Sequence, residues 1–226
     1  MKRVWITRTE PGASELAEAV VMAGWTPVKE PLLTIEPTGA PRPSGQFSMR
    51  VFLSPHAVRH AENDLGNGHF IAVGPATQDA LNRWGVLAQV PDRHDSEGVV
   101  SLLQATLAQS LRDPVLVVQG KNGRMLVQEW CRSQRVPCTT WSVYRRVPRR
   151  VNVACSDVDA LVCDSVESLH LAHAQLRDGK SSLPLVVPSK RIANGARMLE
   201  FANVWISDGP SPGAVVSTLK RSSIDD

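Results

Sequence analysis

An ordered internal repeat is the feature of this 226-residue sequence that most constrains its fold. Shifting the chain by 111 positions superimposes motifs of the first half on motifs of the second half. The matching features are segments 4–7 and 115–118, Gly12 and Gly123, Leu16 and Val127, Ser54 and Ser165, and, at slightly larger offsets, 73–76 with 187–189 and 96–100 with 211–215. Because these features keep the same order in both halves, the pattern predicts a duplicated α/β unit.

Each half alternates short apolar segments with helical patterns. The predicted strands are 3–7, 27–30, 50–53, 69–73, 86–90, 115–119, 138–143, 159–163, 184–187 and 203–206. The predicted helices are 11–23, 55–65, 75–84, 96–110, 122–134, 165–177, 189–199 and 211–220. The strands are rich in Val, Ile and Leu and show no clear alternation, which is typical of parallel strands buried on both faces. The pattern therefore predicts an α/β fold with parallel sheets that carry helices on both faces.

The strands are too many for one comfortable sheet, so two domains are expected. The Pro- and Gly-rich stretch 36–47 reads as a linker or loop, and 147–151 reads as a second crossing. Two crossings at these places predict a discontinuous domain, 1–35 plus 149–226, with an inserted domain at 36–148. Contiguous halves, 1–110 and 111–226, are the simpler interpretation of the repeat, and the sequence does not decide between the two.

Composition narrows the functional classes. The net charge of +3 is small and no Lys/Arg block stands out, which argues against nucleic acid and is compatible with an anionic small substrate. The four cysteines form no C-x-x-C pair, the N-terminus has no apolar signal-like region, and no apolar run could cross a bilayer. We therefore expect free thiols, a cytoplasmic location and no membrane partner.

Small and polar residues follow the predicted strands, at the edge of a parallel sheet where ligands bind. They are Thr7-Arg8, Ser54, Gly74 to Thr77, Gly120 to Arg124, Ser165 and Pro188 to Arg191, with Ser96 and Ser211 as N-caps at helix starts. Free main-chain N–H groups at helix N-termini favour carboxylates or phosphates. The repetition of this pattern in both halves predicts an anion-binding cleft.

Familiar catalytic motifs are missing from the sequence. It contains no dinucleotide fingerprint, Walker A loop or nucleophile elbow, and no carboxylate pair or Ser/His/Asp set. His56 with His60, and His170 with His173, have helical spacing, and we expect all four to be solvent-exposed rather than metal ligands. Tyr144, the single tyrosine, follows a predicted strand at the second crossing. Its phenol could donate a hydrogen bond into the cleft, or it could simply end a strand.

Taken together, these motifs resemble the uroporphyrinogen-III synthase family. The matching segments are 6–8, 30–37, 52–58, 72–77, 95–98, 120–124, 143–146, 187–191 and 210–212, which follow in order over nearly the whole chain. The combination of 73–77, 96–98 and 143–146 is the most specific. Asp164, Val187 to Lys190 and Gly213 depart from the family's usual residues.

The resemblance implies two flavodoxin-like domains joined by a two-stranded linker, with the active site between them. It implies conversion of hydroxymethylbilane, which carries eight carboxylates, to uroporphyrinogen III with inversion of ring D, in tetrapyrrole (heme) biosynthesis. No cofactor or metal is implied. Tyr144 is the implied catalytic residue, assisting departure of the hydroxyl. The hypothesised substrate contacts are Arg8, Ser54, Thr77, Ser96, Lys121, Ser165, Ser189, Arg191 and Ser211. We expect a monomer, and this is compatible with transient contact with the preceding pathway enzyme.

Three other kinds of protein compete with this interpretation. A non-catalytic two-lobed binding protein for an anionic small molecule would share paired α/β lobes and need no catalytic residues, but most such proteins are secreted. A response-regulator-like module should carry an acidic cluster after the first strand, where Thr7-Arg8 stands. A flavin-binding module should carry a phosphate loop there, and Thr9 to Gly12 fits one poorly.

Overall fold

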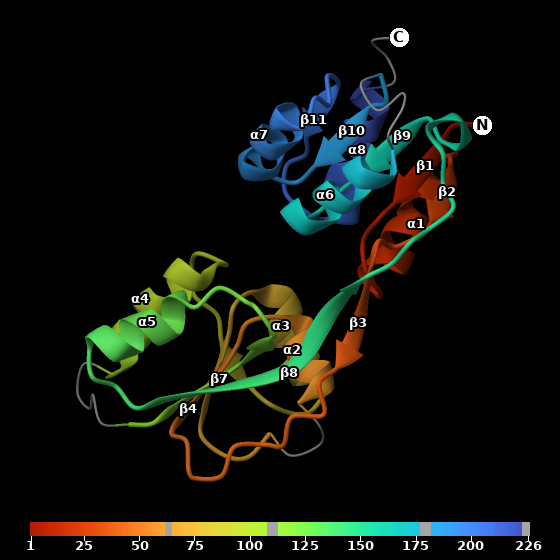
Figure 1. Ribbon diagram of the computed structural model, residues 1–226. Helices are drawn as coiled ribbons and strands as arrows, with labels where there is room; N and C mark the ends of the chain where they lie inside the picture. The colour runs from red at the N-terminus through yellow and green to blue at the C-terminus, as the bar shows by residue number, and fades with distance from the viewer. Residues whose placement is uncertain (62–64, 108–112, 177–181, 223–226) are drawn as a thin grey trace. The chain divides into compact units, whose positions relative to one another are not determined.

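The chain forms two compact α/β units, each with its own sheet (Figure 1). The computed structural model describes residues 1–61, 65–107, 113–176 and 182–222. Unit 1 is Met1–Thr34 with Val147–Asp226, and unit 2 is Ile35–Arg146. The chain leaves unit 1 within strand β3 (Leu33–Pro37) and returns to it within β8 (Cys138–Pro148).

Unit 1 has a five-stranded parallel sheet in the order β11-β10-β9-β1-β2. Its strands are β1 (Arg3–Ile6), β2 (Thr26–Lys29), β9 (Ala160–Val162), β10 (Leu185–Val187) and β11 (Val204–Ile206). Its helices are α1 (Gly12–Met22), α6 (Val166–Gln175), α7 (Lys190–Met198) and α8 (Pro212–Ser222), with a 3₁₀ turn at Cys155–Asp157. This is the doubly wound, flavodoxin-like strand order.

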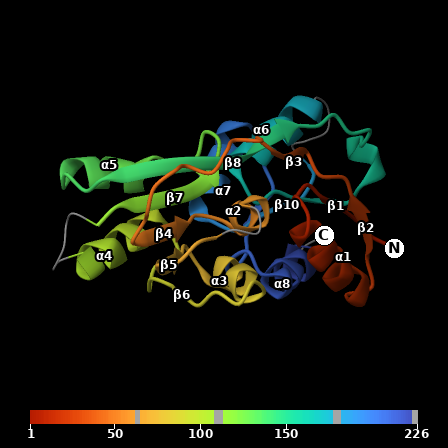
Figure 2. The same ribbon diagram turned by 90° about the horizontal axis from the view of Figure 1, so that it is seen from below.

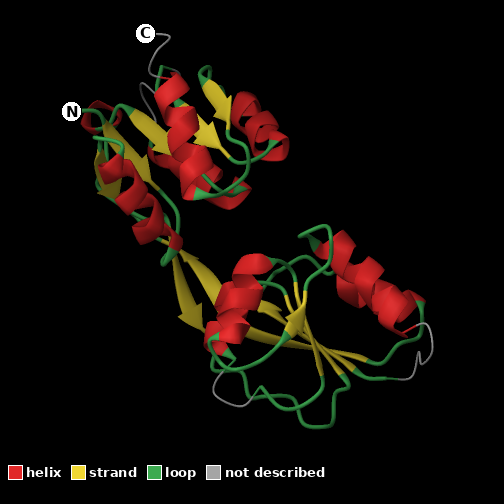
Figure 3. Cartoon of the chain, turned by 180° about the vertical axis from the view of Figure 1, so that it is seen from behind, coloured by secondary structure: helices red, strands yellow, loops and turns green. Residues whose placement is uncertain are grey.

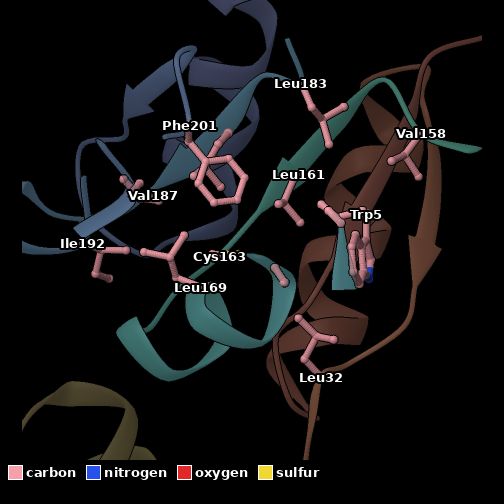
Figure 4. Packing of buried hydrophobic residues seen from close by; sticks show 14 of the residues in the cluster. Trp5, Leu32, Val158, Leu161, Cys163, Leu169, Leu183, Val187, Ile192 and Phe201 are labelled. Atoms are coloured by element: carbon pink, nitrogen blue, oxygen red, sulfur yellow. The ribbon is translucent and has the colours of Figure 1, made fainter. Parts of the chain in front are cut away.

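Helices cover both faces of the unit 1 sheet, as the unbroken apolar strands require. Trp5 points to the side of α6 and α7, where it joins Leu161, Leu169 and Phe201 in one core cluster (Figure 4). Its neighbours Val4 and Ile6 point to the opposite side, where they pack with residues of α1 and α8. Helices α1 and α8 lie side by side there (Figure 2).

Unit 2 has a six-stranded sheet in the order β3-β8-β7-β4-β5-β6. Its further strands are β4 (Met49–Phe52), β5 (His69–Ala72), β6 (Ala88–Gln89) and β7 (Val115–Gly120), and β4 to β8 pair in parallel. Helices α2 (Pro55–His60) and α3 (Pro75–Asn82) contribute to the core on one face of this sheet. Helices α4 (Ser96–Thr106) and α5 (Leu126–Ser133) contribute to the core on the other, so helices flank strands in both units (Figure 3).

The pairing register shows the sequence repeat in three dimensions. Val4 of β1 lies opposite Ala160 of β9, and Val115 of β7 lies opposite Met49 of β4. The shift of 111 positions takes Val4 to Val115 and Met49 to Ala160. Strand β1 therefore corresponds to β7, and β9 to β4, with identical register.

Each unit combines parts of both halves of the repeat. The first half contributes β1-α1-β2 to unit 1 and β4 through α4 to unit 2. The second half contributes β7-α5-β8 to unit 2 and β9 through α8 to unit 1. The repeats thus follow contiguous halves of the chain, whereas the folded units do not.

Several predicted elements differ from the structure. Strand β3 was not predicted, since its residues 36–37 belong to a Pro-rich stretch read as linker, and β8 continues to Pro148 rather than residue 143. The predicted helix 55–65 ends at His60. Positions 62–64, 108–110 and 177 of the predicted helices lie outside the described residues. No helix in the described ranges is long and apolar enough to span a membrane.

The cap of one helix and one offset of the sequence repeat also need correction. Asp95, not Ser96, caps α4, because its carboxylate accepts the Gly98 N–H at 2.8 Å.

The offset between corresponding strands is not 111 throughout. The register pairs Phe70 with Arg50 and Leu185 with Leu161, so β5 and β10 are related by 115 positions. With an offset of 115, the N-cap Gly74 corresponds to the N-cap Ser189. The repeat as aligned from the sequence alone is therefore shifted by one residue at this place.

Gly98 and Gly213, in the corresponding helices α4 and α8, provide a test of this packing. A Cβ at Gly98 would overlap the main-chain oxygen of Arg93, whereas a Cβ at Gly213 would meet nothing within 4 Å. Gly98→Ala should lower the free energy of unfolding by about 1–3 kcal/mol through overpacking. Gly213→Ala should leave it unchanged or raise it by up to about 1 kcal/mol. Urea denaturation followed by circular dichroism measures both, and equal effects would contradict the packing described.

Candidate functional site

The order of strands reverses once in each sheet, and such switch points are where open α/β sheets bind ligands. In unit 2 the chain runs from β4 outward to β5 and β6 and then returns to β7 on the other side of β4. In unit 1 it runs from β1 to β2 and returns to β9 on the other side of β1. The residues that follow β4 and β7, and those that follow β1 and β9, therefore form the two candidate sites.

A pair of hydroxyl groups lies at the unit 2 switch point. Ser54 Oγ and Tyr144 Oη are 3.0 Å apart. Ser54 also caps α2, since its Oγ accepts the Ala57 N–H at 3.0 Å. Tyr144 lies opposite Gly120 across a register shift in β7 and β8, and its main-chain oxygen accepts the Lys121 N–H at 2.7 Å. The pairing of β7 with β8 thus brings Tyr144 to the loop after β4.

The Tyr144 ring is enclosed, with 2% of the residue exposed. A Cβ at Gly120 would lie 2.6 Å from its Cζ and 2.9 Å from its Oη, so only glycine fits beside the ring. The rings of His56 and His60 have centroids 5.5 and 6.0 Å from that of Tyr144. The Arg146 guanidinium carbon lies 5.9 Å from the Tyr144 ring centroid. These contacts leave the phenol little freedom to move.

His56, His60 and His173 are half-buried, which corrects the expectation that all four histidines are solvent-exposed, and only His170 is exposed as expected. Helix α2 turns the side chains of His56 and His60 toward Tyr144 and partly away from water. Burial lowers the pKa of His56 to about 4, and the positive charges of Arg59 and Arg146, with His60, act in the same direction. Burial, followed by Arg59, also lowers the pKa of His60. His56 is therefore uncharged at neutral pH.

The unit 1 switch point carries an ion pair. Arg8 Nε, after β1, lies 3.3 Å from the Asp164 carboxylate, after β9, and the two side chains are 11% and 30% exposed. A terminal nitrogen of Arg8 donates to the Pro210 oxygen at 3.0 Å. Gly12 makes room for this side chain, because a Cβ there would lie 2.6 Å from Arg8 Cδ. Arg8 thus joins three loops at the carboxyl edge of the sheet.

Three predicted serines of unit 1 cap helices along the same edge. Ser165 accepts the Ser168 N–H at 3.0 Å at the start of α6, in the position that Ser54 has in unit 2. Ser189 accepts the Ile192 N–H at 3.4 Å, and Ser211 accepts the Ala214 N–H at 3.4 Å. Each hydroxyl oxygen is therefore already used within the protein as an acceptor for a helix start.

The remaining predicted contacts differ in exposure. The Thr77 side chain is 2% exposed within α3, and Ser96 is half-buried as the first residue of α4. Lys121 and Arg191 are exposed. The structure therefore brings Ser54, Lys121 and Tyr144 together in unit 2, and it places Thr77 in the interior.

Sequence reasoning missed the roles of His56, Gly120 and Asp164. Gly120 stood in a glycine-flanked loop and Asp164 was a departure from the family pattern, but neither observation reveals a contact with Tyr144 or Arg8. No group of three His, Cys, Asp or Glu residues that could hold a metal occurs within the described ranges. All four cysteines are free, and burial raises the pKa of the Cys163 thiol to about 12.

Comparison with known proteins agrees with the resemblance. The family model described as uroporphyrinogen-III synthase HemD matches residues 14–217. A mutant uroporphyrinogen III synthase from the extremely thermophilic bacterium Thermus thermophilus has a similar fold, with a TM-score of 0.65, 14% identity and 100% of both chains covered. The uroporphyrinogen-III synthetase from Helicobacter pylori has a TM-score of 0.67 and 12% identity, covering 97% of this chain and 98% of that one.

These two structural matches, at low identity, establish the fold, and the family model spans most of the sequence. The chain belongs to the uroporphyrinogen-III synthase family.

Proposed function

We propose that this uroporphyrinogen-III synthase, a lyase-type cyclase of heme biosynthesis, uses Tyr144 as the proton donor that starts closure of hydroxymethylbilane. The observation that carries this proposal is the pairing of Tyr144 with Ser54 at the unit 2 switch point, at 3.0 Å. A phenol held by a second hydroxyl is a suitable general acid for a departing hydroxyl group. Tyr144 is also the only tyrosine in the chain.

The proposed reaction begins with departure of the hydroxyl group from ring A. The nitrogen of ring A pushes its lone pair toward the hydroxymethyl carbon, the C–O bond breaks, and the Tyr144 proton joins the departing oxygen, which leaves as water. Ring D then attacks the electrophilic carbon through its own substituted carbon, giving a spiro intermediate. Fragmentation and reclosure give the inverted ring, and the proton released as the last pyrrole regains aromaticity returns to the phenolate. The pyrroles supply the electrons, so the proposed steps draw on no cofactor.

The substrate's eight carboxylates require many donors, and the carboxyl edge of each sheet carries candidate donors. The contacts we propose are Arg8, Ser54, Ser96, Lys121, Ser165, Ser189, Arg191 and Ser211, whereas Thr77, which the sequence also suggested, is buried within α3. The capping serines support this role, because each sits beside main-chain N–H groups at a helix start. Arg8 would bind a carboxylate in competition with Asp164, its partner at 3.3 Å. Positioning of this kind also disfavours spontaneous closure without inversion.

The proposal extends to the state of the protein in the cell. We infer a cytoplasmic monomer whose ligand is the small-molecule substrate, with transient contact with the preceding pathway enzyme. The modest net charge of +3 supports an anionic substrate and gives no sign of a nucleic-acid partner.

Charge around Tyr144 is part of the proposed site. Arg146 lies above the ring, and a phenolate formed after proton transfer is favoured by this cation. His56 contributes no charge at neutral pH, because its pKa is lowered to about 4. In the folded state, protonation of His56 would place a third positive charge in a half-buried position beside those of Arg59 and Arg146.

Replacing Tyr144 by phenylalanine tests the proposed proton donor. With freshly made hydroxymethylbilane, the wild-type protein should yield type III uroporphyrin after oxidation, and the variant should retain binding but lose about 10- to 100-fold in kcat through loss of the proton donor. Chromatographic separation of the type I and type III isomers measures both rate and inversion. Met22→Ala, at an exposed position of α1, should behave as wild type. Only type I product from the wild-type protein would rule out the enzyme activity, and an unchanged Tyr144→Phe would rule out the donor.

The burial of His56 should make the stability of the protein depend on pH. Since folding lowers the pKa of His56 from 6.5 to about 4, the unfolded chain binds the extra proton between these values. The free energy of unfolding should therefore fall as pH drops from 6.5 toward 4. In His56→Gln this fall should be smaller by roughly 1–2 kcal/mol, after allowance for partial solvent exposure. Urea titrations at pH 7.0 and 4.5 measure the difference. His69→Gln, at an exposed position of the same unit, is the matched control, and identical pH dependence in all three proteins would contradict the assignment.

A further inference from the structure

The two hydroxyl groups of Ser54 and Tyr144 have few hydrogen-bonding choices. Among the hydrogen bonds of the described residues, Ser54 Oγ has two partners, the Ala57 N–H at 3.0 Å and Tyr144 Oη at 3.0 Å. Tyr144 Oη has one, Ser54 Oγ. A hydroxyl has one hydrogen to donate and two lone pairs to accept with. Because Ala57 occupies one lone pair of Ser54, the remaining question is which hydroxyl donates to the other.

The two possible directions have different chemical consequences. If Tyr144 donates to Ser54, its proton is committed within the protein and cannot reach a leaving group. If Ser54 donates to Tyr144, the phenolic hydrogen is free to point at an acceptor on a ligand. The second direction also places a donor on the oxygen that becomes negative when the proton leaves, and hydrogen bonds to an ionised oxygen are about twice as strong as neutral ones.

The surroundings of Tyr144 and Ser54 hold the two side chains in place beside each other. Gly120 closes one side, where even a methyl group would lie 2.9 Å from Oη. The rings of His56 and His60 flank the phenol, and Tyr144 as a whole is 2% exposed. Ser54 itself is held by its helix-capping bond and by the proline that follows it. Rotation of the hydroxyl hydrogens, with no movement of heavy atoms, is therefore enough to change between the two directions.

We infer that Ser54 is a positioning residue that donates its hydroxyl hydrogen to Tyr144 Oη while Tyr144 protonates the departing hydroxyl of hydroxymethylbilane. This inference rests on the proposed function, and it gives Ser54 a role through Tyr144 instead of as one more carboxylate contact. Tyr144 loses its proton to the leaving oxygen, and Ser54 keeps its own proton throughout, so it stabilises the phenolate without reacting.

The test combines Ser54→Gly, Ser54→Thr and Tyr144→Phe. Glycine removes the hydroxyl but remains an acceptable N-cap, whereas threonine keeps both the hydroxyl and the cap. Ser54→Gly should lower kcat about tenfold or more with KM changed less than about twofold, and Ser54→Thr should stay within about twofold of wild type in both. In the Tyr144→Phe background, Ser54→Gly should cost less than about twofold in kcat, because the two residues act as one unit.

A second readout does not depend on activity. Since Tyr144 is the only tyrosine, protein grown with ¹³Cζ-labelled tyrosine gives one signal that reports the hydrogen bonding of this phenol. The signal should shift in Ser54→Gly and return toward the wild-type position in Ser54→Thr. Ser165→Gly removes the corresponding cap in unit 1 and should leave the signal in place.

The outcomes separate this inference from the proposed function. An effect of Ser54→Gly on KM alone, additive losses in the double variant, or an unmoved ¹³Cζ signal would each overturn the positioning role. If the wild-type protein made only type I product while the ¹³Cζ signal still moved, the hydroxyl pair would stand and the proposed reaction would fall. Loss of folding in Ser54→Gly, judged by circular dichroism, would leave Ser54→Thr to decide, and a kcat for it as low as that of Tyr144→Phe would overturn the inference.

Discussion

Parallel pairing of strands that are apolar on both faces is the constraint on which this molecule depends. Parallel neighbours cannot be joined by tight turns, so the chain must cross a face of the sheet between them, and here it does so mostly through helices. Strands that pair in parallel all end at the same edge, and the helices that follow them begin there. This edge therefore carries the main-chain N–H groups of those helix starts and the side chains that follow each strand.

The two units use the same arrangement for different chemistry. The corresponding positions Ser54 and Ser165 both cap a helix at a switch point, with the same 3.0 Å contact to an N–H three residues on. In unit 1 the neighbouring side chains are the charged Arg8 and Asp164, whereas in unit 2 the neighbour is the phenol of Tyr144. The two units thus share the same helix-capping geometry, while the side chains around it form an ion pair in unit 1 and a pair of hydroxyls in unit 2.

The sequence was sufficient to predict the α/β class, most of the strands and the capping serines other than Ser96, because each depends on local residue pattern. The contacts of those residues depend on tertiary pairing. Tyr144 reaches Ser54 only because β8 continues past residue 143, beside β7 and a register shift at Gly120. His56 was expected in solvent because its helix looks polar along the sequence, yet the face it occupies is turned toward a buried ring. Strand β3 escaped prediction because its residues overlap a proline-rich stretch and pair only with the distant β8.

The discontinuity of unit 1 has a consequence for how the protein is made. Its strand β1 lies inside the sheet, with β2 on one side and β9 on the other, and β9 begins at residue 160. Residues 1–34 are synthesised before unit 2 and hold only two complete strands and one helix, too little for a core of their own. Unit 2 is continuous in sequence and ends at Arg146, before β9 begins. The opening segment must therefore wait, attached to a finished neighbour, until the last third of the protein arrives to enclose it.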